Sequence, residues 1–177
     1  MLARDLLKEE ILKKAVVKGK VILSSGKEAD FYVDLRRVTL DATAAPLVGE
    51  VMLELTKDLD YEAVGGLTLG ADPVATAMLH EAAKRNRNLN AFVVRKAEKA
   101  HGLQRRIEGP DVKGKKVLAV EDTSTTGGSV LTAVEVLREA GAIVVGVAVI
   151  VERGAKEKVE SSGLEYRAAF SLSDLGL

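Results

Sequence analysis

The stretch VLAVEDTSTTGGSVLT, residues 117–132, decides the fold. It opens with four apolar residues, continues with the acids Glu121 and Asp122, and reaches a helical pattern after four hydroxyl residues and two glycines. A short apolar strand, a loop of small residues and a helix in this order are typical of an α/β unit. The backbone amides of such a loop and the N-terminus of the helix favour a phosphate, while the acids can hold sugar hydroxyls. The stretch therefore predicts a loop that grips a phosphorylated sugar.

The type of phosphate loop is narrowed by two motifs that the chain lacks. There is no G-x-x-x-x-G-K-[ST], because the nearest glycine spacing, Gly65 to Gly70, is followed by Ala71 and Asp72, and there is no G-x-G-x-x-G. The chain therefore lacks the phosphate-binding motifs of nucleoside triphosphatases and of dinucleotide-binding proteins. The plain alternative is a helix-capping loop, which explains most Thr/Ser/Gly loops. The two acids placed before the hydroxyls favour a ligand site.

Working outward, apolar runs and helical patterns alternate along the chain. Strands are expected at 20–23, 31–35, 63–67, 90–95, 116–120, 143–151 and 166–170, and helices at 2–17, 42–57, 73–85, 128–140 and 156–161. Asp41 and Asp72 are good caps for the second and third helices. The alternation predicts an α/β fold with a mostly parallel central sheet flanked by helices, in a single domain over residues 1–177. Because ligands bind at the carboxyl ends of parallel strands, the loops after residues 67, 95, 120 and 151 are expected to form one site.

Composition removes several classes of function. Lys+Arg and Asp+Glu both number 26, so a net charge of zero gives no general support for binding nucleic acid or an anionic membrane. The absence of cysteine excludes disulfides, thiolate metal sites and a cysteine nucleophile. The charged N-terminus lacks the apolar core of a signal peptide, and the longest apolar run is too short to span a bilayer. We expect a cytoplasmic protein with neither a nucleic-acid nor a membrane partner.

A second cluster, RKAEKAHG at residues 95–102, carries three cations and an imidazole. Such a group can neutralise a departing diphosphate, and Gly102 permits a loop that opens and closes. The alternative is a solvated charged loop, which explains most such runs.

Both clusters resemble motifs of one family. VLAVEDTSTTGGS resembles the 5-phosphoribosyl-1-diphosphate (PRPP) signature of the type I phosphoribosyltransferases, and RKAEKAHG resembles the catalytic loop R-K-x-x-K-x-H-G of the orotate phosphoribosyltransferases among them. The resemblance implies transfer of the phosphoribosyl group from PRPP to N1 of orotate, giving orotidine 5′-phosphate and diphosphate in pyrimidine biosynthesis. It also implies the type I phosphoribosyltransferase fold with a small N-terminal hood, built mainly from residues 1–40 and part of the C-terminus.

The same resemblance assigns roles to individual residues. It implies catalytic roles for Lys99, His101, Asp122 and Glu121, and orotate contacts for Thr125 and Arg153. The implied PRPP-binding set comprises the loop cations with the acid and hydroxyl run: Arg95, Lys96, Lys99, His101, Glu121, Asp122, Thr123, Ser124, Thr125, Thr126, Gly127, Gly128 and Ser129. Mg²⁺ is the implied cofactor, held mainly by PRPP and water rather than by a protein cage. A homodimer is implied, with the Arg95–Gly102 loop shared between subunits.

The chain departs from the family pattern at three places. Many bacterial members have Lys where this chain has Ser24, and an aromatic pair where it has Tyr32 and Val33. Some members have Tyr-Lys where Leu69 and Gly70 stand, so backbone amides are expected to bind diphosphate there. Two alternatives stay open: a phosphoribosyltransferase for another base, such as a purine, and a non-catalytic PRPP-sensing regulator.

Overall fold

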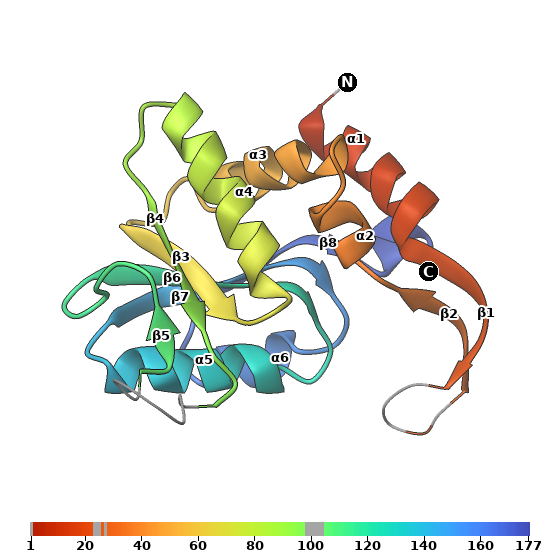
Figure 1. The fold of residues 1–177 in the computed structure, drawn as a ribbon. Coiled ribbons are helices and arrows are strands. Elements are labelled where there is room, and N and C mark those ends of the chain that lie inside the picture. The colour runs from red at the N-terminus through yellow and green to blue at the C-terminus, as the bar shows by residue number, and fades with distance from the viewer. Residues whose placement is uncertain (1, 23–25, 27, 98–104) are drawn as a thin grey trace.

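The fold is a six-stranded sheet between two layers of helices, with a two-stranded hairpin at one side (Figure 1). The computed structural model describes residues 2–22, 26, 28–97 and 105–177. The central strands are β3 (Ala63–Leu67), β4 (Asn90–Val94), β5 (Ile107–Glu108), β6 (Lys116–Ser124), β7 (Ile143–Glu152) and β8 (Tyr166–Ser171).

The sheet has the order β5-β4-β3-β6-β7-β8. All neighbouring pairs are parallel except β4 and β5, which are antiparallel. The prediction of a mostly parallel α/β sheet is confirmed. The two-residue β5 was missed because it is too short to leave a periodic pattern in a polar segment.

Alternate residues of β6 point into the two halves of the core, as expected for a strand covered on both faces. Leu118 and Val120 belong to the cluster under α1 (Ala3–Glu10), α3 (Ala44–Leu55) and α4 (Ala71–Lys84). Val117 and Ala119 belong to the opposite cluster, under α5 (Gly128–Glu139) and α6 (Lys156–Glu160). Figure 1 shows the same division, with α3 and α4 on one side of the sheet and α5 and α6 on the other.

Strand β6 is four residues longer than the apolar run predicted. Glu121 pairs in register with Val149, and Ser124 pairs with Glu152 of β7. Ladder hydrogen bonding thus carries the strand through the acids and the first hydroxyls, which the prediction placed in the loop. These side chains are therefore fixed by the sheet.

Two helix starts were predicted from capping residues. Asp41 Oδ1 accepts the backbone N–H groups of Thr43 and Ala44 at 2.9 and 3.0 Å, which stabilises the start of α3 as predicted. The second prediction was wrong: α4 begins at Ala71, and Asp72 lies in its first turn. The carboxylate of Asp72 accepts the Thr68 hydroxyl at 2.6 Å, which ties it to the preceding loop.

The N-terminal helical segment is shorter than predicted. It comprises α1 and one π-helical turn, Ile11–Ala15, and the chain then enters β1 (Val16–Ile22). This strand forms an antiparallel hairpin with β2 (Glu28–Val33), which leads to the short helix α2 (Arg36–Thr39). The strand began earlier than expected because Val16 and Val17, assigned to the helix by their apolar character, pair with Val33 and Tyr32.

The first helix is tied to the end of the chain by Arg4. Its Nε donates to the carbonyl oxygen of Ala169 at 3.1 Å, and its guanidinium lies 4.6 Å from the centre of the Phe170 ring. Its Nη2 lies 3.4 Å from Oδ2 of Asp174, which is part of the 3₁₀ turn Ser173–Leu175. Within the described part of the chain, no helix has the length and apolar character needed to cross a membrane.

Candidate active site

Two adjoining cavities open at the carboxyl edge of the parallel sheet. The first, of about 290 Å³, is lined by residues 32–36, the loop 67–70 after β3, Lys96, residues 121–123 and Ser129. The second, of about 500 Å³, is lined by Val21, Ile22, Tyr32, residues 123–129 and Arg153. Tyr32, Thr123 and Ser129 line both cavities, so the two spaces share one wall.

Glu121 and Asp122 form the floor of the first cavity and are only 6% and 9% exposed. Burial raises the pKa of Glu121 to about 8, and the neighbouring Asp122 adds to that shift. Burial also raises the pKa of Asp122, but the backbone N–H of Thr123, which donates to Asp122 Oδ1 at 2.7 Å, opposes the rise. Near neutral pH Glu121 is therefore largely protonated, and the pair carries less than two negative charges.

The loop after β3 passes directly over these carboxylates at Gly70. A Cβ atom built on Gly70 would lie 2.0 Å from Glu121 Oε1 and 2.7 Å from Asp122 Oδ1. A larger residue at this position would force the loop or the acid side chains to shift. The approach places the start of α4 beside the acid pair.

The hydroxyl-rich loop turns at Gly127, whose φ of 74° favours glycine, and α5 begins at Gly128. The N–H of Gly128 donates to Thr126 Oγ1 at 3.3 Å. Thr123 Oγ1 is buried and has no hydrogen-bond partner among the described residues. A loop of hydroxyls ahead of a twelve-residue helix offers the N–H groups and dipole that suit an anion.

Arg153 enters the second cavity from the end of β7. Its backbone N–H donates to the carbonyl oxygen of Ser124 at 2.9 Å, and its Nε is buried with no partner in the described parts of the chain. Glu152 fixes the following turn by accepting the N–H of Gly154 and the hydroxyl of Tyr166. A held backbone and an unpaired guanidinium nitrogen leave Arg153 able to bind a ligand oxygen.

The structure separates the two cations that begin the charged loop. Lys96 lines the first cavity. The guanidinium of Arg95 lies 3.5 Å from Glu108 Oε1 on β5 and does not line either cavity. The roles of Lys99, His101 and Gly102, like the departure at Ser24, lie outside the described residues. The remaining predicted residues, 121–129 and Arg153, meet around the two cavities.

Two charged residues of the first cavity were absent from the predicted PRPP- and orotate-binding sets. Asp34 and Arg36 line it, and Arg36 Nε donates to Asp34 Oδ1 at 2.9 Å. The adjacent pair Arg36-Arg37 after a strand was the available signal, but charged residues there also fit an exposed turn.

The acid pair offers carboxylate oxygens to a metal ion. Among the residues that the structure describes, no group of three His, Cys, Asp or Glu side chains is placed to hold a metal ion. Two adjacent carboxylates can offer oxygen to Mg²⁺, but the ion prefers six oxygens and retains waters readily. The residues fit a Mg²⁺ ion whose other oxygens come from a phosphate ligand.

Comparison with known proteins agrees with this geometry. A sequence model described as "Phosphoribosyl transferase domain" matches residues 38–165. A protein named orotate phosphoribosyltransferase from Streptomyces avermitilis is 69% identical over 177 residues, covering 98% of this chain and 97% of its own. Another of that name, from Corynebacterium glutamicum, is 62% identical and covers 99% of this chain and 95% of its own.

A crystal structure of Mycobacterium tuberculosis orotate phosphoribosyltransferase in complex with PRPP superimposes with a TM-score of 0.87 at 51% identity. The match covers 99% of this chain and 100% of that one. The buried acid pair, the hydroxyl loop and the full-length matches lead to one assignment: the chain belongs to the phosphoribosyltransferase family, and within it to the orotate phosphoribosyltransferases.

Proposed function

We propose that the two cavities together bind PRPP and orotate and carry the phosphoribosyl group from diphosphate to N1 of orotate. One observation carries this proposal: the acid pair of β6 lines the first cavity, and the hydroxyl loop that follows it supplies Thr123 and Ser129 to the wall shared by both cavities. A donor that spans both cavities would place its reacting carbon near that wall. Diphosphate would leave on one side and orotate would enter from the other.

The acids and the hydroxyl loop would bind different parts of the phosphoribose group. Residues 123–129 surround the second cavity, where backbone N–H groups and hydroxyls can donate to the 5′-phosphate. Asp122 and Glu121 accept or donate hydrogen bonds at the ribose hydroxyls from the cavity floor. Positive charge develops on the ribose as the bond to diphosphate breaks, and the buried negative charge of Asp122 stabilises it.

Thr125 and Arg153 are proposed to contact orotate, because both line the second cavity beside the loop. The guanidinium suits a planar ring with carbonyl and carboxylate oxygens. Its buried, unpartnered Nε supports this role.

The leaving diphosphate is proposed to bind over β3 and β4. Lys96 and the backbone of residues 67–70 line the first cavity on that side. Arg95, Lys99 and His101 are also predicted to bind PRPP, and Lys99 and His101 are predicted to be catalytic. Mg²⁺, held mainly by PRPP oxygens and water with carboxylate help from Asp122, would reduce the negative charge of the leaving group.

Residues 1–40 and the C-terminus are proposed to form a hood over the orotate side of a single domain. The hairpin supplies Val21, Ile22 and Tyr32 to the second cavity, and Arg4 ties the first helix to β8 and the last turn. The cysteine-free sequence is compatible with a cytoplasmic location, which stays a prediction.

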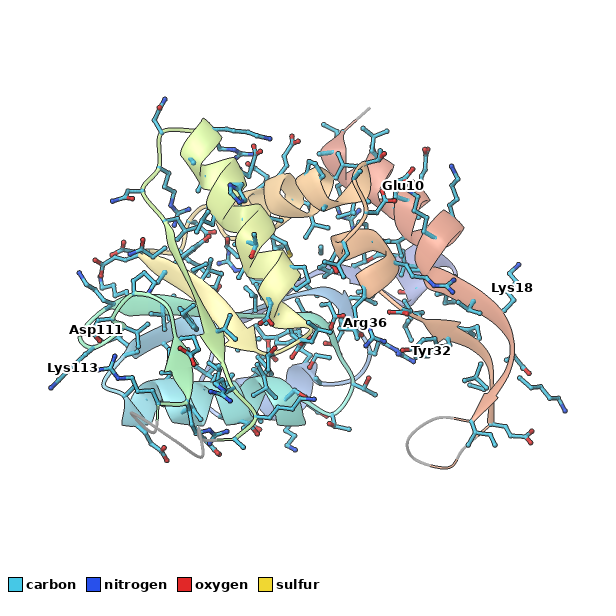
Figure 2. The ribbon with its side chains drawn as sticks, in the orientation of Figure 1. Glu10, Lys18, Tyr32, Arg36, Asp111 and Lys113 are labelled. Atoms are coloured by element: carbon cyan, nitrogen blue, oxygen red, sulfur yellow. The ribbon has the colours of Figure 1, made fainter. Side chains whose placement is uncertain are left out.

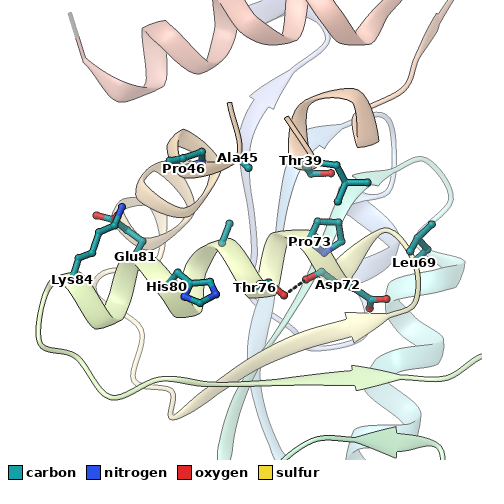
Figure 3. A pocket seen from close by; sticks show the side chains of 12 residues that line it. Thr39, Ala45, Pro46, Leu69, Asp72, Pro73, Thr76, His80, Glu81 and Lys84 are labelled. Atoms are coloured by element: carbon teal, nitrogen blue, oxygen red, sulfur yellow. Dashed lines mark hydrogen bonds and ion pairs between the residues drawn. The ribbon is translucent and has the colours of Figure 1, made fainter. Parts of the chain in front are cut away.

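We further propose a homodimer that uses the groove between α4 and the α2–α3 segment (Figure 3). This groove encloses about 470 Å³, and its wall includes Leu40, Pro46, Leu69 and Pro73. Leu40 and Leu69 are 68% and 54% exposed, which is unusual for leucines on one surface. Leu69 also lines the first cavity, so a second copy docked here would lie at the edge of this site.

The dimer is tested by Leu40→Asp, with Ile143→Asp as a matched control. Ile143 is also exposed, at 53%, but it lies at the start of β7, away from the groove. Sedimentation of the ligand-free proteins should give monomers for Leu40→Asp and dimers for the control. Dimers for both variants would argue against this groove as the interface.

The reaction itself is tested by following the loss of orotate absorbance with PRPP and Mg²⁺. Adenine, hypoxanthine and uracil serve as control acceptors. Turnover of orotate alone is expected. Tight binding of PRPP without turnover of any base would point to a regulator, and turnover of a purine would point to another acceptor.

A further inference from the structure

Arg36 is a cation of the first cavity that the proposed chemistry has not yet used. It is the first residue of α2, separated from the end of the hairpin strand β2 by Asp34 and Leu35. Its side chain is 47% exposed, and the residue lines the cavity together with the acid pair and Lys96. Figure 2 labels Arg36 and Tyr32, which lie close together at the base of the hairpin.

Two neighbours hold the Arg36 guanidinium in place. Its Nε donates to Asp34 Oδ1 at 2.9 Å, and its Nη2 donates to the hydroxyl of Tyr32 at 3.3 Å. The same carboxylate oxygen also accepts the backbone N–H of Arg36 at 3.2 Å. A guanidinium has five N–H donors. These bonds leave part of the donor fork available to a ligand.

The order of strands indicates which part of the donor Arg36 would meet. Along the carboxyl edge, β4 and β3 lie on one side of β6, and β7 lies on the other. Arg36 shares a cavity with Lys96, after β4, and with the loop after β3. It does not line the cavity of Arg153, which follows β7. Tyr32 lines both cavities, and Arg36, which donates to its hydroxyl, lines only the first, the cavity without Arg153.

The charges that line the first cavity also favour contact between Arg36 and diphosphate. The buried acids form the floor of this cavity, and a diphosphate entering it would bring further negative charge. Of the described residues that line it, Arg36 and Lys96 are the ones with permanent positive charge at neutral pH. Arg36 also acts on Asp122, where its charge lowers the carboxyl pKa against the effect of burial.

We propose that Arg36, held by Asp34 and Tyr32, binds the diphosphate group of PRPP and the diphosphate product. This assignment rests on the proposed function, because it takes the first cavity as the diphosphate side of the site. Arg36 and Lys96 are two cations of the same cavity. The side chain of Arg36 is held by Asp34 and Tyr32, whereas Lys96 belongs to the charged loop. A pre-placed fork suits phosphate oxygens better than a free side chain, because less conformational freedom is lost on binding.

The test compares Arg36→Ala with Arg37→Ala, the neighbouring arginine that lines neither cavity. Calorimetric titration with Mg²⁺-diphosphate should give binding weaker by about tenfold or more for Arg36→Ala, the range of a lost charge-assisted hydrogen bond, and unchanged for Arg37→Ala. Titration with orotidine 5′-phosphate, which has no diphosphate, should be little affected in both variants. Arg36→Lys should recover part of the diphosphate affinity, because it keeps the charge without the fork.

The outcomes separate this assignment from the reaction. Wild-type diphosphate affinity in Arg36→Ala would overturn it, as would an equal loss for orotidine 5′-phosphate in a variant whose circular dichroism matches the wild type. If Arg36→Ala does not fold, Arg36→Gln replaces it in the same titrations. If the wild-type protein turns over no orotate, the proposed reaction fails, yet the diphosphate titrations still decide the role of Arg36.

Discussion

At the scale of single residues, the site depends on keeping two adjacent acids out of water without allowing both to ionise. Glu121 and Asp122 lie within the strand β6, which pairs with β7, and both side chains are buried. The result is a largely protonated Glu121 near neutral pH, so the pair carries less than two negative charges. A protonated Glu121 can donate a hydrogen bond to a ribose hydroxyl while Asp122 provides the charge.

Asp122→Asn is expected to lower kcat by about 100-fold or more, because it removes the charge that stabilises the developing cation. The amide oxygen can still accept the N–H of Thr123, so the fold should be retained. Orotate consumption and circular dichroism measure the two effects. Asp111→Asn makes the same change at an exposed position and should keep wild-type activity. Near-normal turnover in Asp122→Asn would remove that residue from catalysis.

Glu121 should make the stability of the ligand-free protein depend on pH. Its pKa is about 8 in the folded protein against an ordinary 4.5, so its favourable, protonated form is fully present below about 4.5. The contribution is lost as the pH rises towards 8. Glu121→Gln should therefore gain at least about 1 kcal/mol of stability relative to wild type between pH 5 and pH 8. Denaturant unfolding at both values measures this, and a pH-independent difference would contradict the pKa shift.

At the scale of elements, the sequence predicted the sheet well and the edges of the site poorly. Strand β3 was predicted with the bounds that the structure has, because a short apolar run between turn residues has few alternative readings. The prediction ended this strand before Glu121 and Asp122, because polar residues after an apolar run usually indicate the end of a strand. In the structure, pairing with β7 extends the strand to Ser124. The sequence of one segment does not show which strand it will pair with.

The site residues follow the same division. The acids, the hydroxyl loop and Arg153 were predicted because each follows a recognisable strand. Asp34 and Arg36 were missed because a hairpin brings them to the sheet edge from far along the chain. Their place in the cavity depends on tertiary packing, which leaves no local pattern.

The junction of β3 and α4 gives a test at this scale. Gly70→Ala would place a methyl group 2.0 Å from Glu121 Oε1, so the loop or the acids must shift. We expect a loss of about 1–3 kcal/mol in unfolding free energy together with reduced turnover. Gly128→Ala has room, with its nearest neighbour at 3.5 Å, and should not lose stability. Thermal unfolding of both variants measures the difference, and equal stability would mean that the close approach is relieved without cost.

At the scale of the whole molecule, Arg4 links the beginning of the chain to its end. Arg4→Met keeps the aliphatic stem but removes the hydrogen bond to Ala169, the ion pair with Asp174 and the contact with the Phe170 ring. The expected loss is about 1 kcal/mol, or about 2–4 °C in Tm for a chain of this size. Lys13→Met, an exposed change close to the same helix, should leave Tm unchanged. Equal Tm values for both variants would show that the tie adds no stability.

The wall shared by the two cavities has a consequence for how acceptor preference can change. Val21, Ile22 and Arg153 line the second cavity alone, whereas Lys96 and the loop after β3 line the first alone. Substitutions in the first group can reshape the room for the base while the machinery for the donor stays intact. A laboratory search for variants that accept other pyrimidines should therefore randomise the hairpin and the turn after β7. Tyr32 should be varied last, because it belongs to the shared wall and a change there would alter the binding of both substrates.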